Sequence, residues 1–100
     1  MNELTSIGSG FDLYGNDSLT NLAGMQNLEY IGDGMLIGGN WSLTSLSGLD
    51  NLTSIGGYLY ITKNHNLLNL NALENVTSIS ELLYVTDNSS LTSLTGLDNI

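Results

Sequence analysis

The chain of 100 residues has the length of one small domain, and its hydrophobic content of 41% is sufficient for a packed core. Ten acidic residues against one lysine, Lys63, and no arginine give a formal net charge of −9, which argues against nucleic acid and anionic membrane surfaces as partners. The absence of cysteine excludes disulfides and thiolate metal sites, and no apolar run approaches the ~20 residues of a membrane span, so no membrane insertion is expected.

The sequence repeats one unit of 24 residues without insertion or deletion. The copies are LTSIGSGFDLYGNDSLTNLAGMQN (4–27), LEYIGDGMLIGGNWSLTSLSGLDN (28–51), LTSIGGYLYITKNHNLLNLNALEN (52–75) and VTSISELLYVTDNSSLTSLTGLDN (76–99), and Ile100 opens a fifth. Seven positions are apolar in every copy, which identifies a repeat protein. In the third copy these positions are Leu52, Ile55, Leu59, Ile61, Leu67, Leu70 and Leu73.

The order of residues within a unit predicts one coil of a β-solenoid. Leu59 and Ile61 are two residues apart, which indicates a strand with alternate side chains inward, and Tyr60 suits a pleated surface. Later in the unit, apolar residues recur every three positions, as in Leu67, Leu70 and Leu73. These segments are short, rich in Ser, Thr and Gly, and lack helix caps and the length of a helix. We therefore predict extended segments and bends there. The expected fold is all-β: a solenoid of four leucine-rich coils stacked ~4.8 Å apart.

Two columns of asparagine follow this pattern. The first is expected to form a ladder, in which side chains bond turn backbone and link successive coils. Its members are Asn16, Asn40, Asn64 and Asn88, and the second column contains Asn27, Asn51, Asn75 and Asn99. The alternative is N-glycosylation of the Asn-x-Ser/Thr sequences at Asn16, Asn40, Asn51, Asn75 and Asn88. A laddered asparagine has no free amide to modify, so the ladder is preferred.

The outward face of the strand is the most informative candidate surface. If Leu59 and Ile61 point inward, Tyr60 lies outward beside Tyr84 of the next copy. Tyrosine offers a large amphipathic contact area at low entropic cost, and a contiguous exposed apolar patch marks a partner site. Stacking that only stabilises the sheet is the competing explanation. The candidate partner-binding residues are Leu36, Tyr58, Tyr60, Leu82 and Tyr84; Asp12, Tyr14, Thr62 and Thr86 share the face.

The phrase LTSIGGYLYITKN, with LTSLSGLDNLTSI in the neighbouring copy, resembles the receptor L-domain family over residues 4–100. These leucine-rich β-helical domains occur in epidermal growth factor and insulin receptors, and related ones occur in bacterial surface proteins. The resemblance implies a right-handed β-helix outside the cell that binds a protein or serves adhesion. This chain departs from the animal members because it lacks every cysteine and is more regular, which favours the bacterial surface type. No binding residue of the family transfers, since the shared motif consists of core and turn positions.

Catalytic and metal chemistry finds little support in the sequence, and no cofactor is expected. The single histidine, His65, lies beside a turn, so a catalytic triad with serine is not expected. Calcium could bind at the column of Gln26, Asp50, Glu74 and Asp98, but a solvated acidic edge is preferred because the calcium-binding nonapeptide is missing. Ice binding through threonine columns is disfavoured, because Leu68 and Glu29 interrupt them.

The ends of the sequence predict a segment of a longer array, with neighbouring repeats of the same chain as contacts. Leu4 and Ile100 are both core positions, so the outer coils would expose apolar faces. The first ten residues carry no signal peptide. The expected function is non-enzymatic extracellular recognition or adhesion, with a protein or glycan bound by the tyrosine face. The alternative is a structural spacer in a surface protein.

Overall fold

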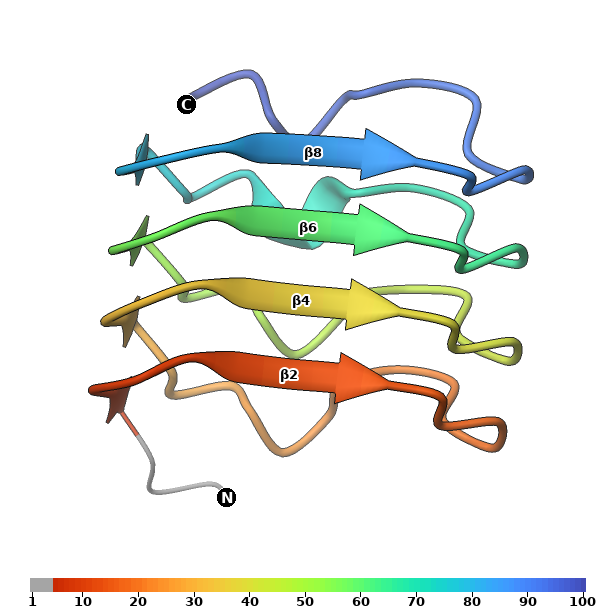
Figure 1. Ribbon diagram of the computed structural model, residues 1–100, viewed down its shortest axis with the longest axis horizontal. Coiled ribbons are helices and arrows are strands. Elements are labelled where there is room, and N and C mark those ends of the chain that lie inside the picture. The colour runs from red at the N-terminus through yellow and green to blue at the C-terminus, as the bar shows by residue number, and fades with distance from the viewer. Residues whose placement is uncertain (1–4) are drawn as a thin grey trace.

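The computed structural model describes residues 5–100 as a stack of coils, each with one short and one longer strand (Figure 1). The paired apolar residues that predicted one strand per unit lie in the longer strands. The short strands have two residues each, too few to show an alternation of apolar and polar residues in the sequence. The short strands are β1 (Ser6–Ile7), β3 (Tyr30–Ile31), β5 (Ser54–Ile55) and β7 (Ser78–Ile79), and the longer ones are β2 (Phe11–Tyr14), β4 (Met35–Gly38), β6 (Leu59–Thr62) and β8 (Leu83–Thr86).

The strands form two parallel sheets, ordered β1-β3-β5-β7 and β2-β4-β6-β8. Leu59 pairs with Met35 on one side and Leu83 on the other, so the register equals the repeat. The longer strands all run the same way, and the chain returns behind them and rises with each coil, which makes the helix right-handed (Figure 1). The predicted solenoid is confirmed with one correction. Four strands in each sheet are separated by about three turns, so four complete coils was an overcount.

The seven apolar columns form the core between the sheets and the returning segments. From Leu28 to Val76, every column residue is buried, with at most 1% of its surface exposed. The columns are less well covered in the last coil, where Leu83 is 42% and Leu94 57% exposed. Leu4, the first column position, lies outside the described residues. Burying a leucine side chain contributes ~1.5–3 kcal/mol, so the middle coils contain most of the apolar stabilisation.

Tight turns account for the last two of the three-residue steps between apolar positions in each copy. In the third copy, the backbone N–H of Leu67 donates to the carbonyl of Asn64, that of Leu73 to Leu70, and that of Val76 to Leu73. Each such bond closes a four-residue turn. The chain therefore turns at these steps, whereas the step from Leu67 to Leu70 has no such bond; each step places one apolar side chain in the core.

One of these turns is helical, which differs from the prediction of extended segments and bends. Gly48 and Gly96 occupy equivalent positions with φ of 117° and 110°, a region that residues with a Cβ atom rarely adopt. A Cβ atom on Gly48 would also collide with the carbonyl group of Leu22 in the neighbouring coil. The third copy has Ala72 at this position, and the chain there forms the 3-10 helix η1 (Asn71–Leu73). An alanine that cannot follow the glycine path is accommodated by a tighter local turn.

Candidate functional site

The outward side chains of the longer strands lie in rows that cross the sheet. Leu36, Tyr60 and Tyr84 pair directly in the register of β4, β6 and β8, and Asp12 of β2 completes the row. A parallel row contains Tyr58 and Leu82, which immediately precede β6 and β8. The fold therefore brings all five candidate partner-binding residues onto one face.

The tyrosines on this face contact one another. The ring centroids of Tyr58 and Tyr60 are 4.8 Å apart with planes at 53°, and those of Tyr60 and Tyr84 are 5.2 Å apart at 46°. Tilted pairs at this distance stabilise by ~0.5–1.5 kcal/mol beyond their buried area. Tyr84 is 50% and Leu82 53% exposed, whereas a smaller fraction of Tyr58 and of Tyr60 is exposed. Leu82 and Tyr84 lie at and beside β8, which has a neighbouring strand on one side only.

Two tyrosine rings also cover glycines of the second coil. A Cβ atom on Gly34 would collide with the ring of Tyr58, which therefore lies over that glycine. On the other flank, a Cβ atom on Gly38 would lie 3.0 Å from the ring of Tyr14. This packing was not predicted from the sequence, although glycine at outward positions beside tyrosine was a usable signal. These rings shield strand backbone from water, so part of the tyrosine face has a structural role.

The first asparagine column runs through the stack beside the strands. Asn64 is fully buried, and its Oδ1 accepts from the backbone N–H of Asn40 (3.2 Å) and from Asn40 Nδ2 (3.1 Å). Its Nδ2 donates to the carbonyl of Ile37 (3.0 Å) and to Asn88 Oδ1 (3.2 Å). Asn16 continues the column at the first coil, where it is exposed and donates to Asn40 Oδ1. Each side chain thus joins adjacent coils, and the buried ones form hydrogen bonds with buried backbone groups.

Comparison with family models shows that the pattern extends along nearly the whole chain. The model of the receptor L domain matches residues 4–99. The chain belongs to the receptor L domain family. Comparisons with curated proteins and with solved structures give no match. The family suggests an extracellular module that binds ligands without catalysis. In the described part of this receptor L domain, no helix is long and apolar enough to cross a membrane.

The histidine of this receptor L domain makes two contacts that the sequence did not indicate. The His65 ring lies 5.1 Å from the ring of Trp41, with planes at 47°, and its Nδ1 is 3.2 Å from Ser89 Oγ. All three residues occupy one column of the repeat. Over residues 5–100, no carboxylate bonds to the other ring nitrogen, which a serine–histidine–acid triad requires. The contacts therefore form a surface stack without catalytic geometry.

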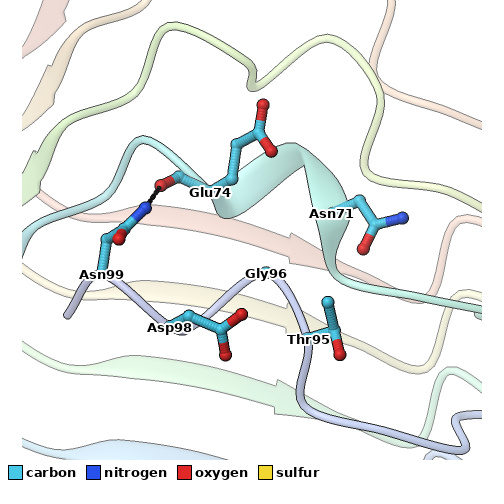
Figure 2. A pocket seen from close by; sticks show the side chains of 6 residues that line it. All are labelled: Asn71, Glu74, Thr95, Gly96, Asp98 and Asn99. Carbon is cyan, nitrogen blue, oxygen red and sulfur yellow. Dashed lines mark hydrogen bonds between the residues drawn. The ribbon is translucent and has the colours of Figure 1, made fainter.

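The acidic column of the L domain borders a cleft of about 180 Å³ (Figure 2). Asn99 Nδ2 donates to the backbone carbonyl of Glu74 (2.6 Å), while the carboxylates of Glu74 and Asp98 point in different directions. In the earlier coils, Asn75 Nδ2 donates in the same way to the carbonyl of Asp50, and Asn51 Nδ2 to that of Gln26. The second asparagine column thus links coils at the surface. Within residues 5–100, no three His, Cys, Asp or Glu side chains are grouped to hold a metal ion.

Proposed function

We propose that this L domain is a non-enzymatic extracellular recognition module that binds a partner through its tyrosine face. The face consists of Leu36, Tyr58, Tyr60, Leu82 and Tyr84. Adhesion to cells or matrix is the proposed outcome of that binding. The support comes from the family and from one observation: aromatic and aliphatic side chains gather on a regular sheet, with Tyr84 and Leu82 half exposed.

The fold favours this face for recognition because the sheet supplies a rigid base. Leu36 and Tyr60 belong to strands β4 and β6, which are paired on both sides, so the positions of these side chains are fixed before a partner arrives. Tyrosine adds a large contact area with few rotatable bonds. Little conformational entropy would then be lost on binding, which favours affinity.

A structural spacer remains the second candidate, and a specific observation favours it. Tyr58 covers Gly34, Tyr14 covers Gly38, and Tyr60 lies between two other rings. These contacts stabilise the sheet whether or not a partner exists. A spacer would use the tyrosines only to hold coils together, and its length alone would matter.

A double substitution separates the two functions. Tyr60→Ala with Tyr84→Ala removes the centre of the face and should abolish binding of the labelled domain to whole cells or matrix, with circular dichroism unchanged. The matched control is Tyr30→Ala with Trp41→Ala, which removes two exposed aromatics outside the face. Binding that survives the first pair, or falls equally with the second, would refute recognition through the tyrosine face. His65→Ala should affect neither measurement, since catalysis has no part in the proposal.

A further inference from the structure

The two ends of the stack expose core positions that the middle coils bury. We call the end at the last repeat the upper end and the end at the first repeat the lower end, as they lie in Figure 1. Leu59 is fully buried, whereas Leu83, its equivalent at the upper end, is 42% exposed. Leu70 and Leu94 differ in the same way, with 0% and 57% of their surfaces exposed. At the lower end, the core residue Leu13 is also only partly buried. The difference between equivalent leucines is the surface that a coil stacked above would cover.

The asparagine ladder has a direction, which makes the two ends complementary. The backbone N–H of Asn40 donates to Oδ1 of Asn64 (3.2 Å), and that of Asn64 donates to Oδ1 of Asn88 (3.0 Å). Within residues 5–100, no coil lies above Asn88 to accept from its N–H, and none lies below Asn16 to donate to its Oδ1. Two upper ends in contact would supply no such acceptor, because the Oδ1 of Asn88 already accepts from the N–H and Nδ2 of Asn64. An upper end therefore matches a lower end.

The acidic residues of the two ends avoid one another when a second copy continues the repeat. In that register each residue of the first repeat lies on its equivalent in the last repeat of the other copy, as equivalent residues pair within the chain. No acidic residue among 5–27 then lies on an acidic residue among 76–99, so the contact lacks the directly opposed like charges that destabilise paired strands. The pairs that include an acidic residue are Ser9 with Glu81, Asp12 with Tyr84, Gly15 with Asp87, Asp17 with Ser89 and Gln26 with Asp98.

We propose that the lower end of one copy of this chain stacks on the upper end of a second copy, so that the coils continue from chain to chain. Any coil in the repeat register fits these edges, and in a solution of this chain the coil available is that of a second copy. The N–H of Asn88 then donates to Oδ1 of Asn16, and the exposed surfaces of Leu83 and Leu94 are covered. This contact repeats the one that joins coils within the chain. Because its two surfaces differ, each pair keeps one free end of either kind, and the assembly grows. The inference is independent of the proposed recognition function.

Gly8 allows the lower end to be blocked without disturbing the fold. A Cβ atom on Gly32 or Gly56 would collide with the carbonyl oxygen of the equivalent glycine in the coil below, whereas one on Gly8 meets no atom within 4 Å. In the stacked pair Gly8 lies over Ser80 of the other copy, so a side chain there would collide in the same way. Gly8→Val should therefore prevent stacking and leave the monomer intact.

The test measures the mass of the full chain by analytical ultracentrifugation over a range of concentrations. The parent should form a growing series of oligomers of the 10.7 kDa chain. Leu83→Lys with Leu94→Lys places charge on the upper end and should leave a monomer, as should Gly8→Val at the lower end. Mixed in equal amounts, these two variants still offer one lower and one upper end, so they should form a species of twice the monomer mass that grows no further.

The matched control is Tyr30→Lys with Leu68→Lys, which adds the same charge at residues of the middle coils that are 43% and 57% exposed. It should assemble like the parent. If circular dichroism shows that the Leu83 and Leu94 pair unfolds the chain, Leu94→Lys alone replaces it.

Three results would overturn the proposal. A parent that stays at the monomer mass shows that the ends do not associate. A dimer formed by Gly8→Val alone shows that two upper ends meet instead. Assembly that persists in both end variants, or is lost equally in the control, shows that the contact lies elsewhere on the molecule.

Discussion

Replacing Asn64 by alanine should be among the most destabilising single changes in the asparagine ladder. The substitution removes four hydrogen bonds in a site with no solvent exposure. It leaves the Asn40 N–H and the Ile37 carbonyl without their side-chain partner. Each bond contributes ~1 kcal/mol, and a buried donor left unsatisfied costs ~1–3 kcal/mol. The expected loss is therefore about 4 kcal/mol, a large part of the ~5–15 kcal/mol that stabilises a typical domain.

The equivalent change at Asn16 is the internal control. Asn16 Nδ2 donates to the Tyr14 carbonyl (3.3 Å) and to Asn40 Oδ1 (3.2 Å), but the residue is exposed. Water can replace its bonds, so Asn16→Ala should cost about 1 kcal/mol or less. Urea unfolding followed by circular dichroism measures both free energies, with an unchanged dependence on urea expected for each variant.

A third variant separates hydrogen bonding from the cavity that alanine leaves. Asn64→Leu keeps the branched shape and the number of heavy side-chain atoms but removes every polar contact, so it should destabilise about as much as Asn64→Ala. The reasoning would be refuted if Asn64→Ala lowered the free energy of unfolding no more than Asn16→Ala. Near-native stability of Asn64→Leu would show that volume, not hydrogen bonding, makes this position important.

Two further substitutions, each with a control substitution, test the backbone conformations of the turns. Gly48→Ala should destabilise the fold by about 3 kcal/mol or more, because φ is 117° and the added Cβ atom meets neighbouring backbone. Ala72→Gly at the equivalent position should cost ~1 kcal/mol at most. Similar unfolding midpoints for the two variants would contradict this expectation. Lys63→Gly should stabilise the fold by ~0.5–1 kcal/mol, because Lys63 has φ of 57° where two earlier copies have glycine. Thr62→Gly in strand β6 is the control and should destabilise the fold. If Lys63→Gly unfolds at a lower temperature than the parent, the backbone at Lys63 is not strained.

The core was predictable from the sequence because each coil repeats the same contacts. An apolar residue such as Leu59 recurs every 24 residues, and the strand register has that same offset. Periodicity therefore identified both the inward side chains and their neighbours. It also placed Tyr60 beside Tyr84, since a parallel sheet in exact repeat register stacks equivalent positions.

Features that depend on departures from the repeat were not predictable in this way. The helix η1 arises because Ala72 interrupts a glycine column, and the contact of Trp41 with His65 joins residues that differ between copies. Ser80 occupies a column that is otherwise glycine, and its N–H bond to the Ile55 carbonyl is 3.1 Å, against 2.7 Å for the equivalent bond of Gly56 to Ile31. Such effects depend on how one side chain fits against the backbone of the next coil. Alignment of the repeats shows which residues are equivalent but not how they fit.

The bonds between coils also determine how the chain can change in length. Those that involve side chains join residues separated by 24, 25 or 27 positions, as in Asn40 to Asn64, Asn75 to Asp50 and Asn64 to Ile37. Loss of one residue within a coil would offset every column beyond it and pair core leucines with polar neighbours. Loss or duplication of a complete unit would instead present each side chain with an equivalent partner. Insertions and deletions are thus tolerated as whole multiples of the repeat, while the outward side chains of each coil can diverge independently.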